Sequence, residues 1–160
     1  MKNLLSNIVV AVSGSDASIN AAKYGILLSK YYNCSLTAVY VVDTATLKQL
    51  LLTRIFIEEE SNEYEESLET NGRRYLNYVE ELGRKKGIPV ETVIRKGAIF
   101  SEVLKLADER NADLILLGGW ERDRSYRDVI STAHREIIYQ AKCSVLVVKE
   151  QDIEHLFNKM

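Results

Sequence analysis

Five short apolar runs, separated by stretches with helical spacing, constrain the fold of this chain more than any other feature. Each run is rich in β-branched or other aliphatic residues, which suits strands that are covered on both faces. Strands that alternate with helices favour a parallel, doubly wound α/β sheet. The runs predicted as strands are Ile8–Val12, Leu36–Val42, Val90–Ile94, Leu114–Leu117 and Val145–Val148.

The segments between these runs carry apolar residues at helical intervals. A helix is expected from Ala17, with Ser15 or Asp16 as its N-cap. The carboxylate-rich stretch 58–69 is expected to begin a long, solvated helix that stops at Gly87, before Pro89. Two further helices are predicted over Ile99–Arg110 and over residues 126–141. Residues 44–60 leave two alternatives open, a lid over a site or a long connection.

The length of the chain predicts one domain. It has 160 residues, of which 46% are hydrophobic, and no linker or low-complexity segment divides it. We expect an α/β domain over residues 1–149 and a short amphipathic or frayed tail over residues 150–160. The two cysteines, Cys34 and Cys143, make neither a disulfide scaffold nor a cysteine-rich metal site.

The net charge and the N-terminal sequence indicate which partners and which cellular location to expect. The formal net charge is -2, so no basic surface predicts nucleic acid or anionic membrane as a partner. The apolar run near the N-terminus is too short to span a bilayer, and no cleavage-site pattern follows it. We therefore expect a cytoplasmic protein.

Two strand ends carry residues suited to a ligand site, since ligands of open parallel sheets bind beyond the carboxyl ends of the strands. One is the turn Ser13–Asp16, and the other is the segment 118–125, which begins with two glycines. Each also has a purely structural interpretation. The first turn would serve as a helix cap, and the charged residues of 121–128 would form a solvated, internally paired loop. Trp120 would pack over its loop, and His134 and His155 lie too far apart for a metal site.

With these turns in place, the chain resembles the universal stress protein family over roughly residues 5–149. The resemblance rests on order and spacing as well as residue type. It is carried by Ser13-Gly14-Ser15, Val41-Val42-Asp43, Ala112-Asp113-Leu114-Ile115 and the segment from Ala141 to Val148. It implies a single five-stranded parallel sheet in the order 3-2-1-4-5 with helices on both faces. It also implies a homodimer that pairs through the last strand, Ser144–Lys149, whose bare edge would otherwise invite aggregation.

Members of this family that bind nucleotides carry the motif G-x-x-G, nine residues, then G-[S/T]. Here Gly118 and Thr132 match it, whereas Glu121 and Ser131 stand where glycines would be, and Ser13 replaces the Asp of the first turn. The resemblance implies ATP or AMP, with Mg, as the possible ligand. Ser13 and Gly14 would lie near the ribose and the metal, and Val41 would lie against adenine. The residues expected around the phosphates are Gly118, Arg122, Ser131 and Thr132.

These departures weaken the expected phosphate site. Glycines let a backbone approach an anion closely, and Glu121 adds a carboxylate instead. Two unit charges about 4 Å apart repel by about 1 kcal/mol in water and about 4 kcal/mol at an effective dielectric of 20. The neighbouring arginines Arg122, Arg124 and Arg127 could offset that repulsion. Ser131 and Thr132 are expected at a helix N-terminus, which attracts anions.

Two functions follow. The first is a non-enzymatic stress-response or regulatory protein, acting as a dimer on a regulatory partner and keeping only a degenerate nucleotide site. The alternative is a nucleotide-binding switch or a slow ATPase, although the sequence contains no obvious general base for hydrolysis.

Overall fold

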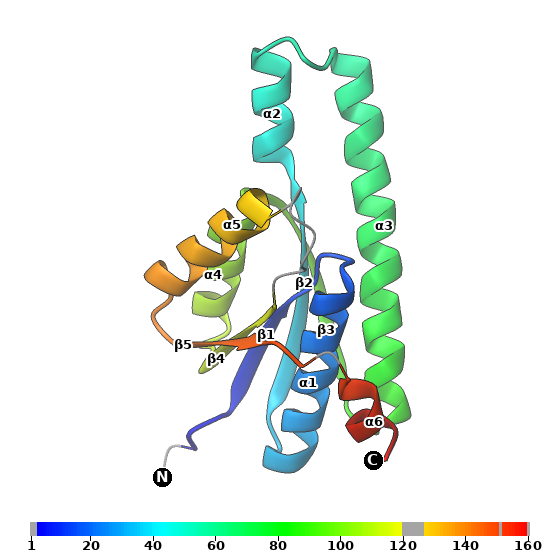
Figure 1. Ribbon diagram of the computed structural model, residues 1–160, viewed down its shortest axis with the longest axis vertical. Helices are drawn as coiled ribbons and strands as arrows, with labels where there is room; N and C mark the ends of the chain where they lie inside the picture. Colours follow the sequence, from blue (N-terminus) through cyan, green and yellow to red (C-terminus); the bar gives the residue numbers. More distant parts are fainter. Residues whose placement is uncertain (1–2, 120–126, 151, 160) are drawn as a thin grey trace.

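A five-stranded, entirely parallel sheet forms the centre of the molecule (Figure 1). The computed structural model describes residues 3–119, 127–150 and 152–159, and for 127–131 it describes the backbone alone. The strands run in the order β3-β2-β1-β4-β5, which confirms the predicted topology. Their bounds are β1 Asn7–Ala11, β2 Ser35–Asp43, β3 Val90–Gly97, β4 Leu114–Gly118 and β5 Ser144–Val148. The strand β3 continues three residues beyond the prediction because it stays paired with the long β2 as far as Gly97.

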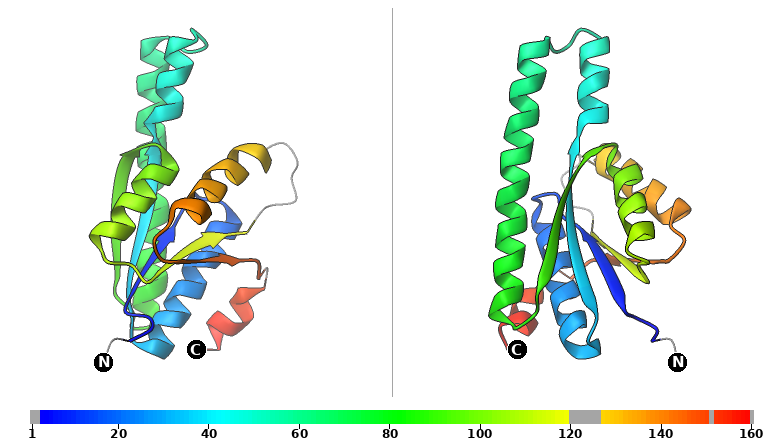
Figure 2. Two further views of the ribbon diagram at one scale, coloured as in Figure 1. Left: turned by 90° about the vertical axis from the view of Figure 1, so that its left-hand side faces the viewer. Right: turned by 180° about the vertical axis from the view of Figure 1, so that it is seen from behind.

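Helices cover both faces of the sheet (Figure 2). One face is covered by α1 (Asp16–Tyr32), α3 (Glu58–Lys85) and α6 (Ile153–Asn158), and the other by α4 (Ile99–Glu109) and α5 (Arg127–Gln140). Alternation along each strand supplies two cores. In β1, Ile8 and Val10 face α1 and α3, whereas Val9 faces α4. Within the described residues, none of the helices combines the length and apolar character that a membrane crossing requires.

The helix α3 begins and ends where the sequence predicts. It starts at Glu58, in the carboxylate-rich stretch, and its last residue is Lys85. Gly87 follows with a φ of +74°, a conformation that L side chains rarely adopt, so the glycine provides the expected stop.

Residues 44–60, for which two alternatives were open, form most of a projecting helical hairpin. Asp43 caps the helix α2 (Thr44–Leu52), a short turn follows, and the chain then enters α3. We call residues 44–66 the arm. The free ends of its two helices stand clear of the rest of the molecule in Figures 1 and 2. The segment is thus a structured projection that starts beside the carboxyl end of the sheet.

The C-terminal segment is an amphipathic helix that packs on the core. In α6, Ile153 is 1% exposed and Phe157 is 4% exposed, and both belong to the same core as β1 and α1. The ammonium of Lys23 on α1 lies 2.8 Å from a carboxylate oxygen of Glu154 and 5.9 Å from the centre of the Phe157 ring. These contacts hold α6 against α1.

Candidate functional site

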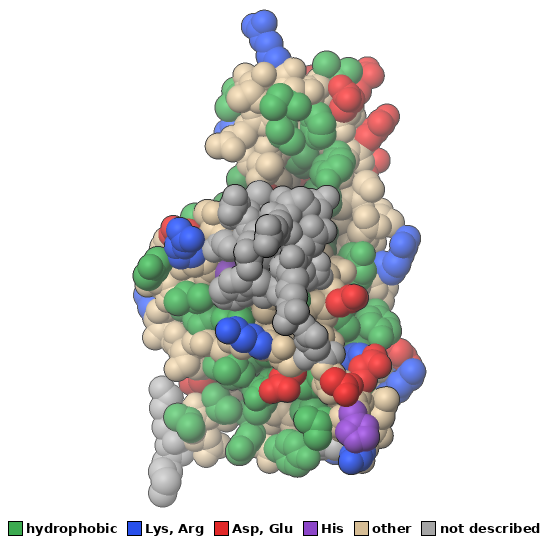
Figure 3. Space-filling view, in the orientation of Figure 1, with side chains coloured by type: hydrophobic (Ala, Val, Ile, Leu, Met, Phe, Trp, Pro, Cys, Tyr) green, Lys and Arg blue, Asp and Glu red, His purple; other side chains and the backbone are tan. Residues whose placement is uncertain are grey.

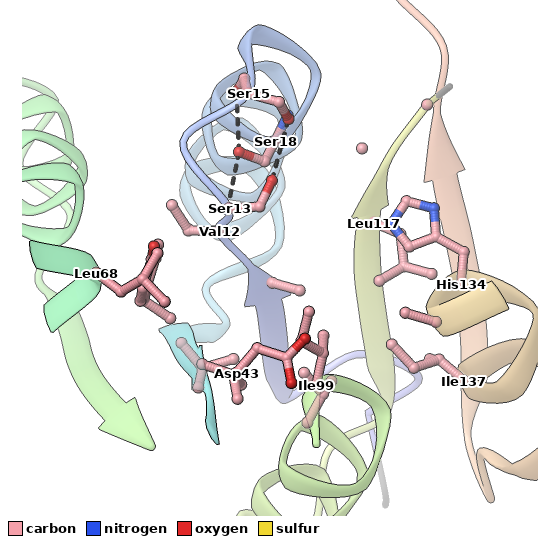
Figure 4. A pocket seen from close by; sticks show the side chains of 18 residues that line it. Val12, Ser13, Ser15, Ser18, Asp43, Leu68, Ile99, Leu117, His134 and Ile137 are labelled. Atoms are coloured by element: carbon pink, nitrogen blue, oxygen red, sulfur yellow. Dashed lines mark hydrogen bonds between the residues drawn. The ribbon is translucent and has the colours of Figure 1, made fainter. Parts of the chain in front are cut away.

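A cavity of about 220 Å³ lies at the carboxyl ends of β1, β2 and β4. Figure 4 shows side chains converging on it from these strands and from α1, α3, α4 and α5. This is the place where parallel sheets of this kind bind ligands, because the strand order reverses there. Its described lining is mostly apolar, including Val39, Val41, Leu68, Ile99, Val103, Leu117 and Ile137.

The turn between β1 and α1 and the first residues of α1 supply the serine hydroxyls of the cavity, Ser13, Ser15 and Ser18. The Ser15 hydroxyl accepts a hydrogen bond from the Ser18 backbone N–H at 3.1 Å, so Ser15 is the N-cap of α1. The Ser18 hydroxyl donates to the Ser15 carbonyl at 2.9 Å and accepts from the Ser13 N–H at 3.1 Å. The Ser13 and Ser15 hydroxyls lie 3.1 Å apart (Figure 4). This network holds the turn in one conformation.

Gly14 is required by the packing of this turn. Its φ is +85°, and a Cβ at this position would lie 2.4 Å from Cε2 of Tyr75 on α3. The Tyr75 ring in turn stacks with Tyr40 of β2, with their centres 6.4 Å apart. A side chain at position 14 would therefore displace Tyr75, which gives this glycine a structural role whatever the cavity binds.

Gly118, at the end of β4, permits an equally close approach. A Cβ there would lie 2.6 Å from the carbonyl carbon of Ala17, a backbone atom that cannot move aside without shifting α1. Gly118 thus lets the end of β4 pack against the first turn of α1. The same contact brings both strand-end turns to the cavity.

Asp43 is the one carboxylate among the described lining residues. One of its oxygens accepts from the Thr46 N–H at 3.0 Å, and the other accepts from the Thr46 hydroxyl at 2.7 Å. The described lining contains no lysine or arginine. The described walls therefore offer hydroxyl and apolar contacts to a ligand, with a single negative charge that is already engaged in capping α2.

His134 of α5 also lines the cavity, and sequence reasoning missed it (Figure 4). Burial lowers the pKa of its imidazole, so the ring is neutral at neutral pH. A signal was present in the sequence, since His134 precedes the fully buried Ile137 by three residues and so shares its helix face. The sequence alone does not show that this face of the helix lies against the ends of β1 and β4.

The predicted site residues fall into three groups. Ser13, Val41 and Gly118 line the cavity, and Gly14 lies next to it beneath Tyr75. Arg122 and Glu121 lie outside the described residues. Ser131 and Thr132 are in α5, where the side chain of Thr132 is exposed and that of Ser131 is not described.

The expectation that Ser131 and Thr132 begin a helix is corrected by the structure. The helix α5 begins at Arg127, so these residues lie in its second turn, where backbone N–H groups bond within the helix. The physical reason is visible in the sequence: apolar residues recur at helical intervals over 126–141, and no glycine at position 131 interrupts them.

Metal and thiol chemistry receive no support from the described residues. No group of three or more His, Cys, Asp or Glu side chains in the described part of the chain is arranged to hold a metal ion. Burial raises the pKa of both the Cys34 and the Cys143 thiols, which keeps them protonated and weakly nucleophilic.

Comparisons with known proteins agree on one family. The model of the Universal stress protein family matches residues 5–149. A universal stress protein of Methanocaldococcus jannaschii is 30% identical over 149 residues, which cover 93% of this chain and 85% of that protein.

Solved structures show the same fold. The universal stress protein UspA from Lactobacillus plantarum superimposes with a TM-score of 0.74 at 21% identity, covering 92% of this chain and all of that one. The universal stress protein from Archaeoglobus fulgidus in complex with dAMP gives a TM-score of 0.61 at 16% identity, covering 92% of this chain and 100% of that one. With the family model spanning nearly the whole chain, the resemblance seen in its motifs is confirmed: this chain belongs to the universal stress protein family.

Proposed function

We propose that this protein is a non-enzymatic regulatory member of its family that binds the nucleoside part of an adenine nucleotide weakly. Its phosphate site is degenerate, and the protein acts as a dimer. The observation that carries the proposal is the chemistry of the cavity, whose described lining combines apolar walls with serine hydroxyls and has no lysine or arginine.

The cavity fits a base and sugar better than a triphosphate. Val41 and Leu117 offer aliphatic surface to a base, and Ser13 offers a hydroxyl to a ribose. The volume of about 220 Å³ is below the roughly 300–1,000 Å³ of typical small-molecule pockets. Solved relatives with this fold were determined in complex with dAMP and with cAMP, which supports adenine nucleotides as the ligand class.

Phosphates and Mg²⁺ would find few partners in the described lining. Asp43 would be its only carboxylate ligand for a metal, and Thr46 already occupies both of its oxygens. The burial of His134 disfavours the imidazolium form that would attract phosphate. Glu121 adds the wrong charge to the motif that would cradle phosphates.

A ligand titration tests this proposal. Adenosine, AMP and ATP, each with and without Mg²⁺, are compared by thermal shift. We expect stabilisation by all three at millimolar concentration, with ATP no tighter than adenosine. A ligand at one hundred times its Kd stabilises by about 2.7 kcal/mol, which is readily measured. The proposal would be contradicted if none of the three ligands stabilised the protein. It would also be contradicted if ATP bound tenfold more tightly than adenosine.

The substitution Glu121→Gly isolates the phosphate site. It restores a motif glycine and removes a negative charge, so ATP affinity should rise about tenfold, the equivalent of 1.4 kcal/mol. Adenosine affinity should not change, because adenosine carries no phosphate. An equal change for both ligands would show that position 121 acts on the cavity in some other way.

A slow ATPase is the second candidate, and His134 favours it. A neutral imidazole that lines the cavity is competent to accept a proton from water. Release of inorganic phosphate from Mg-ATP, lost in His134→Gln but retained in Glu121→Gly, would establish hydrolysis and overturn the non-enzymatic proposal.

The dimer is proposed from the edge position of β5. This strand pairs only with β4 among the described strands, so its outer edge offers unpaired backbone groups. We expect a dimer in sedimentation at tens of micromolar. A strict monomer at that concentration would contradict this part of the proposal.

A further inference from the structure

The arm exposes apolar side chains at its free end. Leu52 is 74% exposed, Ile55 is 65% exposed and Ile57 is 59% exposed. Tyr64, 50% exposed, meets the ring of Phe56 edge-on at 5.8 Å and so adjoins them. We call Leu52, Ile55, Ile57 and Tyr64 the apolar tip. Figure 3 shows hydrophobic side chains gathered over α2 at this end of the molecule.

The arm is weakly held by the rest of the described molecule. Only Leu47 of α2 is buried, and Ser61 is the only buried residue of α3 before Gly72. A nine-residue helix is marginal by itself in water, because most helical stability comes from packing an apolar face. Few apolar side chains of the arm are buried within the molecule, and several are exposed to solvent. Such a surface is suited to contact with another molecule.

The charge around the apolar tip selects the class of partner. Over positions 44–69 seven glutamates, all between 58 and 69, outnumber two basic residues, Lys48 on α2 and Arg54 in the turn beside Leu52 and Ile55. The arm is therefore acidic on balance, and its negative charge is concentrated on α3. Carboxylate oxygens of Glu65 and Glu69 lie 3.7 and 3.2 Å from the ammonium nitrogen of Lys96. In the described part of the chain no ion pair involves Glu58, Glu59 or Glu60, which all lie in the first turn of α3. Figure 3 shows acidic side chains along α3 beside the hydrophobic patch.

Two other occupants are disfavoured by this charge. A second arm would bring one acidic helix against another, and like charges repel. A membrane that contains anionic lipids would repel the same glutamates. A protein segment with an apolar stripe flanked by Lys or Arg satisfies both the apolar and the charged parts of the surface.

We propose that the arm is a docking site for a basic amphipathic segment of a partner protein. The partner's apolar residues pack on Leu52, Ile55 and Ile57, and its cations face the first-turn glutamates of α3. This inference goes beyond the nucleotide cavity and needs no ligand there. It can therefore fail while the nucleotide proposal stands, and the reverse is also true.

The test uses the full chain and a synthetic probe. A fluorescent helical peptide of about 18 residues, with leucines on one face and lysines on the other, is titrated by anisotropy without nucleotide. The reference peptide has glutamate in place of every lysine. We expect the lysine peptide to bind at least tenfold tighter, with affinity that falls as salt is raised.

Variants separate the two parts of the surface. The double variant Leu52→Ser/Ile55→Ser should weaken binding about tenfold, as loss of an apolar anchor does. The triple variant Glu58→Gln/Glu59→Gln/Glu60→Gln should weaken it and flatten its salt dependence. Leu156→Ser removes a 55% exposed leucine of α6 and should leave binding unchanged.

Several results would overturn the proposal. These are equal binding of both peptides, no binding of the lysine peptide, or losses in the arm variants no larger than in Leu156→Ser. A dimer in sedimentation that Leu52→Ser/Ile55→Ser converts to monomer would instead identify a second copy of this chain as the occupant.

Discussion

The two halves of α3 form one continuous helix yet have opposite surroundings. The second half buries Leu76, Val79 and Leu82 against the sheet, whereas the first half, in the arm, buries only Ser61. The glutamates of its acidic first turn, Glu58, Glu59 and Glu60, are instead exposed. The comparison shows that packing of one half of a helix on the sheet is enough to extend the other half away from the sheet, even though that other half buries few side chains.

Close packing is what fixes the second half. A Cβ at Gly72 would lie 2.4 Å from Cδ1 of Tyr40, and one at Gly83 would lie 2.5 Å from Cγ2 of Val90. The two glycines therefore let α3 approach β2 and β3 more closely than side chains would permit. No comparable contact is needed in the arm, where both helices face solvent on most sides.

The largest expected effect comes from cutting a core side chain in the second half. Leu76 is 3% exposed, so Leu76→Ala should lower the free energy of unfolding by about 2–5 kcal/mol. The matched change Leu52→Ala in the arm should cost less than about 0.5 kcal/mol, because Leu52 is already in solvent. Urea denaturation measures both. Similar losses in the two variants would remove the distinction between the packed half of α3 and the arm.

A smaller effect is expected from filling the space at Gly72. Alanine gains about 1 kcal/mol of helix propensity, but overpacking against the Tyr40 ring typically costs about 1–3 kcal/mol. We expect Gly72→Ala to be destabilising by about 1 kcal/mol on balance. Ser67→Ala, at an exposed position of the same helix, serves as the control and should be neutral or slightly stabilising. A stabilised Gly72→Ala would mean that α3 moves away from β2 at little cost.

The smallest effect concerns Glu69, at the boundary of the two halves. A hydrogen bond from Arg73 and another from Lys96 hold the pKa of its carboxyl below the ordinary 4.5. The folded state therefore favours the ionised form. This stabilisation is present above pH 4.5 and is lost as the pH falls through the lowered folded pKa.

Glu69→Gln should accordingly shift the urea midpoint slightly downward at pH 7, and the difference from the wild type should vanish in acid. Glu66→Gln, one turn earlier and exposed, is the matched control, because Glu66 takes part in no ion pair within the described part of the chain. A gap between Glu69→Gln and wild type that persists at low pH would point to packing rather than charge.

The sequence predicts the sheet well because each strand is a contiguous run of apolar residues, so its existence needs no tertiary information. The same holds for the turn at Gly87. The arm could not be predicted, since residues 44–60 mix apolar and polar positions without burying most of them. Hydrophobic periodicity reports burial, and here the apolar residues face solvent.

The cavity was predictable only in part. Ser13 follows β1, Val41 lies near the end of β2 and Gly118 is the last residue of β4, and parallel topology brings strand ends together. His134 enters from the middle of a helix, where only the packing of α5 on the sheet decides which side chains reach the cavity. The helix predicted over 126–141 agrees with α5, Arg127–Gln140. Only the placing of Ser131 and Thr132 at a helix N-terminus was wrong, because it followed the family motif instead of the helical repeat of this chain.

The contacts of α6 bear on where this protein can be cut. The family match ends at residue 149, but Ile153 and Phe157 fill space in the central core. A fragment that stopped at the family boundary would open a gap beside α1. It would also leave the ammonium of Lys23, 5% exposed, without the carboxylate of Glu154. The folding unit of this chain therefore extends beyond the residues that the family model matches. A protein expressed for study should include α6.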